Sequence, residues 1–331
     1  MKKKLIAMLL SAAMCLSLAA CGQKADTPDT PDSSEPSGDA VTYTVGICQL
    51  VQHAALDAAT QGFIDALNEE LPGQVKFEEK NASGDSNNCA TIVNGFVSEG
   101  VDLIMANATA ALTASASATA DIPILGTSIT AYGVALDIDD FSGTVGGNIS
   151  GTSDLADLSK QADMITEWFP ETQKVGLLFC SAEPNSRYQI EEVAKSLSAK
   201  GIETKEFAFT DTNDVSSVTQ AACDYADVIY VPTDNIAAAN TEAIANVTVP
   251  SNTPVIAGEE GICTGCGVAT LSISYYDLGV TTGKMAAKIL TGEADISTMP
   301  IEFTTATPKY NAAMCEALGI TPLEGYTAIE K

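Results

Sequence analysis

The chain has 331 residues, and 43 acidic side chains against 16 lysines and arginines give it a formal net charge of −27. This charge argues against a nucleic-acid partner and against a basic patch that would lie on an anionic membrane surface. After residue 40 no apolar stretch reaches the about 20 residues that a membrane-spanning helix needs. The remainder, roughly 290 residues, fits two domains of ordinary size.

The first forty residues read as a targeting segment. Three lysines at 2–4 precede an apolar run at 5–20, which is the pattern of a signal peptide. The run ends in Leu18-Ala19-Ala20-Cys21, which resembles the lipobox of bacterial lipoproteins, so we expect cleavage before Cys21 and lipidation (diacylglyceryl and palmitate) of its thiol. The alternative is an ordinary secretory signal in which the cysteine occurs by chance.

The segment that follows Cys21 is almost free of apolar side chains. Residues 22–40 contain mainly Thr, Pro, Asp, Ser, Glu and Gly, and such a composition cannot bury enough surface to offset the entropy of ordering. We therefore expect a flexible linker at 21–40. Together these features predict a protein on the extracytoplasmic face of the cell membrane, attached to it through the lipid anchor only.

Seven cysteines remain after Cys15 and Cys21 are set aside. Cys48 and Cys180 lie in apolar, strand-like runs and are predicted to be buried thiols. Cys263 and Cys266 have the CxxC spacing, but one such pair without a second pair or a histidine is weak evidence for metal. A local disulfide or two unreacted thiols is the favoured interpretation and a metal or redox centre the alternative. We predict no metal and no cofactor.

Strand-like and helix-like patterns alternate through the first half of the body. Apolar, β-branched runs indicate buried strands, and apolar residues at helical spacing indicate helices with one buried face. The predicted strands are 41–50, 75–80, 101–106 and 123–127, and the predicted helices are 54–71, 88–98 and 109–120.

The pattern restarts after Asp154, and 174–180 (KVGLLFC) resembles 45–48 (VGIC). The predicted helices are 155–169, 185–197, 215–225, 236–247, 276–290 and 310–318, and the predicted strands are 174–180, 203–209, 227–231, 254–258, 267–272 and 301–305. Alternating strands and helices predict parallel sheets covered by helices on both faces. The fold class is therefore α/β, with two similar doubly wound lobes.

Small polar residues follow the predicted strands. Ligands of open α/β sheets bind at the carboxyl ends of the strands, near helix N-termini, so two lobes facing each other form a cleft. The residues at these positions are Gln49, His53, Asn107, Thr109, Ser128, Ser181, Asn185, Thr233, Asp234, Asn235, Glu259 and Glu260.

Six blocks of the sequence carry a family resemblance. The segments 45–67, 101–111, 146–154, 181–186, 229–235 and 271–290 look like the tryptophan/tyrosine-type ABC transporter substrate-binding family. The resemblance implies the type I periplasmic-binding-protein fold and an aromatic or related amino acid as ligand, delivered to an ABC permease. Two loops depart from the family pattern: Asn107-Ala108-Thr109 stands where relatives usually have Gly-Thr-Pro, and 128–132 (SITAY) where they usually have Thr-Asp-Pro.

The resemblance also implies three chain crossings that form a hinge. The expected N-terminal lobe is 43–150 plus 274–297, and the expected C-terminal lobe is 151–273 plus 298–331. Ligand binding should close the lobes about crossings near 150, 273 and 298.

An amino-acid zwitterion needs donors for its carboxylate and an acceptor for its ammonium. Backbone N–H groups near Thr109 and the hydroxyls of Thr109 and Ser128 are candidate donors. Asp234 is the first candidate for the ammonium, with a helix N-cap as its alternative role, and Asn185 can bridge either group. The predicted ligand-binding residues are Gln49, His53, Thr109, Ser128, Asn185, Asp234 and Glu259.

Several side chains have two interpretations. His53, the only histidine, could contact ligand or merely pack or cap a helix. Arg187, the only arginine, is placed on the surface, with a contact to the carboxylate of the ligand as the alternative. Tyr132, Tyr188 and Tyr275 are candidates for stacking on a ligand ring, each with lobe packing as the alternative. Trp168 is predicted to lie in the core.

We predict a monomeric solute-binding protein without catalytic activity. An enzyme is the first alternative, but the sequence has one histidine, no nucleophile elbow, no P-loop and no dinucleotide fingerprint. The second is a regulatory lipoprotein that docks a protein partner. The third keeps the class and changes the ligand to a branched-chain amino acid, a nucleoside or a small peptide-like metabolite.

Overall fold

The computed structural model describes residues 42–330. The predicted signal peptide, the lipidation of Cys21 and the linker at 21–40 lie outside the described residues. Val41–Lys331 is one compact unit. Among the described residues, no helix combines the length and the apolar character needed to cross a membrane.

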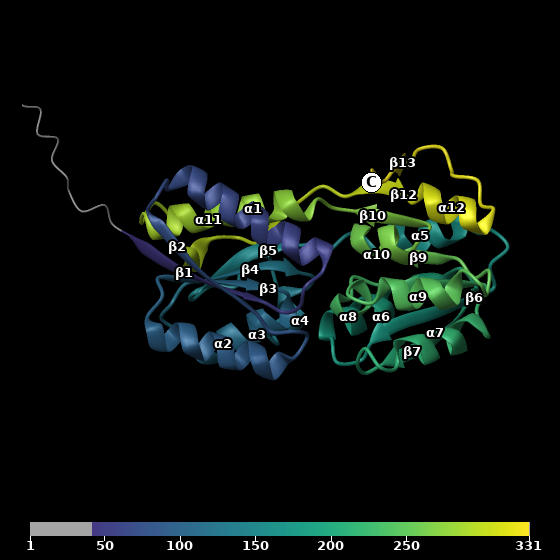
Figure 1. Ribbon diagram of the computed structural model, residues 1–331, viewed down its shortest axis with the longest axis horizontal. Helices are drawn as coiled ribbons and strands as arrows, with labels where there is room; N and C mark the ends of the chain where they lie inside the picture. Colours follow the sequence, from purple (N-terminus) through teal and green to yellow (C-terminus); the bar gives the residue numbers. More distant parts are fainter. Residues whose placement is uncertain (1–41, 331) are drawn as a thin grey trace, which may run out of the picture. The chain divides into compact units, whose positions relative to one another are not determined.

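The first lobe is a six-stranded parallel sheet with strand order β11-β5-β4-β3-β1-β2. Its elements are β1 Tyr43–Gln49, α1 Ala54–Glu70, β2 Val75–Asn81, α2 Ser86–Glu99, β3 Leu103–Asn107, α3 Thr109–Ala118, β4 Ile124–Ile129, α4 Tyr132–Ala135, β5 Ile149–Ser153, α11 Tyr275–Leu290, η1 Ile296–Thr298 and β11 Glu302–Phe303. Helices α1 and α11 cover one face of the sheet, and α2 and α3 cover the other (Figure 1).

The second lobe is a seven-stranded sheet with strand order β13-β12-β10-β9-β8-β6-β7. Its elements are α5 Leu158–Trp168, β6 Lys174–Cys180, α6 Pro184–Ala199, β7 Glu203–Phe209, α7 Val215–Cys223, β8 Val228–Val231, α8 Asn235–Ala238, α9 Thr241–Thr248, β9 Val255–Ala257, α10 Glu260–Cys266, β10 Ala269–Ser272, β12 Thr307–Tyr310, α12 Ala312–Leu318 and β13 Thr327–Ala328. All pairs are parallel except β10 with β12. The predicted fold class, two doubly wound α/β lobes, is confirmed.

The chain passes between the two sheets after β5, after β10 and after β11. The first and third passages lie later than the predicted boundaries at 150 and 298, because β5 and β11 pair with each other at the edge of the first sheet. The sequence pattern missed β5, whose residues Ile149–Ser153 are mostly small and polar.

Helices α1 and α11 pack closely because glycines face the contact. A Cβ atom on Gly279 would lie 2.0 Å from the carbonyl oxygen of Ala59, and one on Gly62 would lie 2.1 Å from that of Tyr276. Only residues without a side chain permit this approach of two backbones. The contact fixes the N-terminus of α1 beside the passage between the lobes.

Some predicted elements differ from the structure. The helix predicted at 236–247 is divided into α8 and α9, with Asn240 as the N-cap position of α9. The helix predicted at 310–318 begins at Ala312, because Tyr310 pairs with Ala269 in the sheet and Asn311 caps the helix. The short helices α4 and α10 were not predicted.

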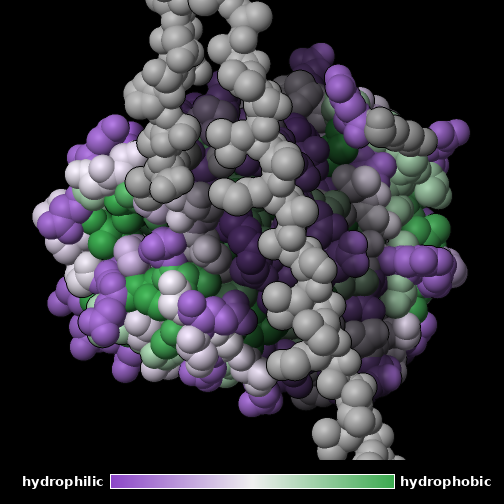
Figure 2. Space-filling view, turned by 60° about the vertical axis from the view of Figure 1, so that its left-hand side comes forward, coloured by the Kyte–Doolittle hydropathy of each residue, from purple (hydrophilic) through white to green (hydrophobic). Residues whose placement is uncertain are grey.

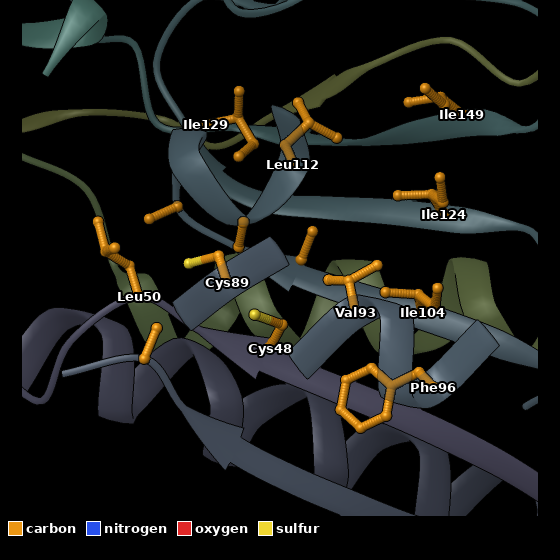
Figure 3. Packing of buried hydrophobic residues seen from close by; sticks show 14 of the residues in the cluster. Cys48, Leu50, Cys89, Val93, Phe96, Ile104, Leu112, Ile124, Ile129 and Ile149 are labelled. Carbon is orange, nitrogen blue, oxygen red and sulfur yellow. The ribbon is translucent and has the colours of Figure 1, made fainter. Parts of the chain in front are cut away.

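Cys48, Cys180 and Trp168 lie in the cores, as predicted. Cys48 and Cys180 are fully buried, and in Figure 3 the Cys48 and Cys89 side chains lie among apolar residues of the first lobe. Cys263 and Cys266 are free, buried thiols on α10. Trp168 is buried and packs against Tyr310 and Tyr326.

On the face shown in Figure 2, exposed hydrophobic side chains do not gather into one large patch. Instead, they form separate small patches among hydrophilic residues. Among the described residues, the large apolar side chains that are clearly exposed are Val134, Tyr276 and Phe303.

Candidate ligand-binding site

A small closed chamber lies where the two lobes meet. Its volume is about 10 Å³, close to the minimum that holds one water molecule. The residues that line it are His53, Leu56, Ser128, Thr130, Asp154, Asn185, Thr233, Asp234, Asn235, Ala238, Glu259 and Tyr275. Most of them follow strands, so the chamber lies at the carboxyl ends of both sheets, as the fold class predicts.

A larger pocket of about 600 Å³ adjoins the chamber and shares His53, Ala238, Glu259 and Tyr275 with it. We call it the cleft pocket. Its other lining residues include small apolar side chains of α1, such as Ala54, Ala55 and Ala58, and come otherwise mainly from α10 and from residues 273–276 at the start of α11. The two cavities together form a cleft between the lobes.

Three carboxyl groups line the chamber and are almost completely buried. Asp154, Asp234 and Glu259 are 4%, 1% and 3% exposed. Burial raises the pKa of Asp154 to about 6, against the hydrogen bond from Tyr275, and raises the pKa of Glu259 to about 7. Burial and the neighbouring carboxylate of Glu183 also raise the pKa of Asp234. Each shift has the same cause, because a charged form without a cationic partner is unfavourable in a dry site.

The wall of the chamber supplies no cation. Within residues 42–330, no lysine or arginine lines it. Lys309 lines the cleft pocket but is bound to Glu260 at 2.6 Å. Arg187 pairs with Glu206 at 2.8 Å and lies over the ring of Phe179 at the surface, where the sequence placed it.

Four lining residues have a buried polar atom without a hydrogen-bond partner among the described residues. These atoms are His53 Nδ1, Ser128 Oγ, Asp154 Oδ1 and Asn185 Oδ1. A buried polar atom without a partner costs about 1–3 kcal/mol, so four of them around one small cavity call for a polar group that fills it.

Asp154 differs from the other two carboxyl groups in having an open oxygen. Its Oδ2 accepts a 2.9 Å hydrogen bond from the hydroxyl of Tyr275, and its Oδ1 has no hydrogen bond of good geometry among residues 42–330, although the side chain of Thr130 lies close enough to lower the pKa of the carboxyl group. By contrast, Asp234 accepts from the backbone N–H groups of Ala237 and Cys180. Glu259 accepts from two N–H groups at the start of α10.

The backbone near the chamber is strained at one of these residues. Ser128 has a φ of 55°, where non-glycine residues are uncommon, and the pairing of β4 with β5 shifts register between Gly126 and Ile129. Such strain persists only where the surroundings enforce it, and it is frequent at ligand sites. The irregularity leaves Ser128, near the end of β4, without a register partner in β5, and its side chain lines the chamber.

The structure brings together most of the predicted site residues. His53, Ser128, Asn185, Asp234 and Glu259 line the chamber. Asp234 is also the N-cap of α8, which was the alternative role weighed for it, and Glu259 caps α10. Whether these five contact a ligand stays a prediction.

Gln49 and Thr109 lie away from the chamber. Gln49 donates to Asp57 and accepts from Thr60, so it ties β1 to α1 behind the chamber wall. Thr109 lines a separate groove that is formed by α2, by α3 and by Ala182 and Pro184 of the second lobe.

Of the three tyrosines, Tyr275 lines the chamber. Tyr132 is buried, and its hydroxyl donates to the backbone oxygens of Gly126 and Thr152. Tyr188 lies in a pocket beside α4 and β5.

The sequence analysis missed Asp154 as a site residue. It was read as the point where the second half begins, because β5 before it was not predicted. An aspartate that directly follows a short run of small residues between two α/β repeats was the available signal. Once β5 is known, Asp154 stands at a strand end like the other candidates.

Comparisons with known proteins agree with this architecture. Residues 44–326 match the family described as ABC transporter substrate binding protein. A protein of Clostridioides difficile named "Tyrosine-binding protein" is 29% identical over 299 residues, which cover 88% of this chain and 85% of that relative.

Two solved structures share 31% identity with the chain and differ in their ligand state by their descriptions. One, from Streptococcus pneumonia, is an ABC domain in complex with L-Trp, with a TM-score of 0.82 and coverage of 87% of this chain and 100% of that one. The other is the ligand-free, open structure of a substrate binding protein with adhesive properties from Clostridium difficile, with a TM-score of 0.66 and coverage of 87% and 99%. The family match spans nearly all of the described residues, so the chain belongs to the ABC transporter substrate-binding proteins of the tryptophan/tyrosine type.

Proposed function

We propose that the protein captures an amino acid with an aromatic side chain between its lobes and delivers it to an ABC permease, while a lipid on Cys21 holds it at the membrane. The observation that carries the choice of ligand is the open, buried oxygen of Asp154 in a chamber without a cation. The ligand has to bring the missing positive charge.

An α-ammonium group fits the chamber in size and in charge. The volume of about 10 Å³ suits a single small polar group rather than a ring. Asp154 Oδ1 would accept a charge-assisted hydrogen bond from the ammonium, which is roughly twice as strong as a neutral one. A nucleoside has no such group, so the chamber disfavours it.

The rest of the ligand would occupy the cleft pocket. Its volume of about 600 Å³ accommodates an indole or phenol ring, and its alanines together with Tyr275 offer apolar contact. The N-terminus of α1 lies on the same pocket through Ala54 and Ala55, and its N-cap residue His53 makes no side-chain cap. Free N–H groups there would receive the ligand carboxylate, in place of those near Thr109 that the sequence suggested.

The arrangement of the lobes supports capture by closure. At equal sequence identity, the chain superposes better on the relative in complex with L-Trp than on the open, ligand-free relative. Closed lobes and a nearly filled chamber are what a binding protein adopts around its ligand.

The direct test measures binding of L-tryptophan, L-tyrosine and L-phenylalanine by calorimetry and by thermal unfolding of residues 40–331. We expect at least one of them to bind. Deaminated analogues of the same ring, such as 3-indolepropionate, should not bind, because they lack the ammonium. Asp154→Asn should weaken the best ligand by about 30-fold or more, since losing a charged hydrogen bond costs about 2–3 kcal/mol.

Asp163→Asn is the matched control. Asp163 forms an exposed ion pair with Lys200 on the second lobe, and such pairs contribute little to stability. The variant should therefore bind the amino acid with the affinity of the wild type. If the deaminated analogue binds as well as the amino acid, or if Asp154→Asn binds within twofold of the wild type, the ammonium assignment is wrong.

A further inference from the structure

Glu183 is a buried carboxylate near the cleft that does not line the chamber. It precedes α6, is 7% exposed, and is absent from the chamber wall among the described residues. Its four hydrogen bonds all come from N–H groups. Asn235 N (3.1 Å), Asn235 Nδ2 (2.6 Å) and Asn185 Nδ2 (3.2 Å) donate to Oε2, and Ile236 N (3.0 Å) donates to Oε1. Both of its oxygens therefore act as acceptors.

This contact fixes the orientation of Asn235. Because Nδ2 of Asn235 faces the carboxylate, its Oδ1 is the atom that lies 3.3 Å from Nε2 of His53 in the other lobe. An amide oxygen accepts only, so Nε2 of His53 has to carry the proton.

The tautomer of His53 follows from that proton. A neutral imidazole has one N–H, so Nδ1 is then an acceptor. Nδ1 is buried and has no partner among residues 42–330. The ring stays neutral more easily here than in water, because burial lowers the pKa of His53.

Glu183 orients Asn185 in the same sense. Nδ2 of Asn185 donates to Glu183 Oε2 and to the backbone oxygen of Thr233 at 3.1 Å. The amide oxygen, Oδ1, is consequently the atom left without a partner in the part of the chain that the structure describes. It too is an acceptor.

We propose that Glu183, without touching the ligand, is the positioning residue that sets both Asn185 Oδ1 and His53 Nδ1 as acceptors, so that the chamber selects a primary ammonium group. Together with Asp154 Oδ1 these atoms make three acceptors, and a primary ammonium has three N–H donors. This inference rests on the proposed capture of an amino acid. It adds that N-methylation should be tolerated poorly, since each methyl group removes one donor.

Glu183→Gln tests the proposal because it replaces one acceptor by a donor at nearly constant shape. The new amide NH₂ faces donors in either orientation: Ile236 N from the Oε1 position, or Asn235 N and the Nδ2 groups of Asn185 and Asn235 from the Oε2 position. In the second orientation, a flip of Asn235 relieves the donor–donor clash between the two side-chain amides. The flipped amide would present Nδ2 to His53 Nε2, so the proton would move to Nδ1, which would then point a donor at the ammonium. We expect the dissociation constant for the best amino acid to rise tenfold or more.

The sole histidine makes the tautomer directly measurable. Long-range ¹⁵N–¹H NMR at pH 8 should show the Nε2–H tautomer for His53 in the wild-type complex and the Nδ1–H tautomer in Glu183→Gln. The control Glu192→Gln carries the same substitution on the same helix, in an exposed pair with Lys195, and should match the wild type in both affinity and spectrum. If Glu183→Gln only weakened the fold, it would lower the free energy of unfolding without changing the tautomer of His53.

The outcomes separate this inference from the proposed function. If amino acids bind but the histidine spectra of the wild type, Glu183→Gln and Asn235→Ala are identical, the inference is overturned and the proposed function stands. If no amino acid binds, the proposed function fails, and the ligand-free spectra decide: a changed tautomer in either variant supports the inference, and identical spectra in both overturn it. Should Glu183→Gln fail to fold, Asn235→Ala removes the partner of Nε2. It should then give a mixture of tautomers and weaker binding, whereas an unchanged spectrum overturns the proposal.

Discussion

The carboxyl group of Asp154 shows how a single side chain ties ligand binding to pH. Its pKa is raised to about 6 in the closed chamber because burial penalises the charged form. An ammonium beside the carboxyl group would favour its charged form and lower the pKa of Asp154 below the ordinary value. A proton on Asp154 therefore competes with the ligand.

Affinity should consequently fall at acidic pH. In the ligand-free, open protein the carboxyl group of Asp154 is exposed to water and has its ordinary pKa near 4, so the dissociation constant at pH 4 should be about twofold higher than at pH 7.5. Calorimetry across this range measures it. Glu259, with a pKa of about 7, and Asp234 also line the chamber, but their oxygens accept from backbone N–H groups, so Asp154→Asn should remove most of the pH dependence. A profile that is flat in the wild type would contradict the assignment.

The residue scale is also where sequence reasoning reached its limit. The principle that strand ends carry ligand residues identified His53, Ser128, Asn185 and Glu259 as positions on the chamber. It could not separate Asp234, whose oxygens are used by backbone N–H groups, from Asp154, whose Oδ1 is open. That distinction depends on which donors lie nearby in space, and spacing in the sequence does not report it.

At the scale of elements, glycines allow α1 and α11 to pack closely against each other. The prediction concerns Gly279, which is buried where a Cβ atom would come within 2.0 Å of the carbonyl oxygen of Ala59. Gly279→Ala should lower the free energy of unfolding by about 1–3 kcal/mol, because the helices have to separate. Urea unfolding measures the change.

Gly95→Ala provides the matched control on α2. A Cβ atom there would meet nothing within 4 Å, and alanine is the better helix former by about 1 kcal/mol. The same substitution should therefore stabilise the protein at position 95 and destabilise it at 279. Equal effects at the two positions would mean that the α1–α11 contact is not as close as the structure shows.

Elements with a strong apolar period were predictable, and short polar ones were not. The buried strands β1, β3 and β6 are continuous apolar runs, and their sequence signal is local. Strand β5 (ISGTS) has no such pattern and was not predicted, whereas β11 (EF) lies within the strand predicted at 301–305. Strand β5 pairs with β4 and with β11, so its formation depends on the tertiary fold, and the pairing of β5 with β11 sets the position of two passages between the lobes.

At the scale of the whole molecule, the same carboxyl groups oppose closure without a ligand. Closing the lobes at pH 7.5 buries Asp154 and Glu259 while both are mainly ionised, and the chamber wall offers them no lysine or arginine among the described residues. A pKa that rises on closure means that protons favour the closed form. The ligand-free protein should therefore be open at pH 7.5, and the ammonium of the ligand should close it.

Small-angle X-ray scattering of residues 40–331 measures this coupling through the radius of gyration. The radius of the ligand-free wild type should decrease when the best amino acid is added and also, without ligand, when the pH is lowered from 7.5 to 5. Over that range the ratio of closed to open protein should rise about tenfold from Asp154 alone, if its pKa in the open form is the ordinary one.

Asp154→Asn separates affinity from closure, because it removes both the ammonium acceptor and one buried charge. The variant should bind more weakly than the wild type and yet, without ligand at pH 7.5, be more closed. A ligand-free variant as open as the wild type would show that something other than the buried charge of Asp154 keeps the lobes apart.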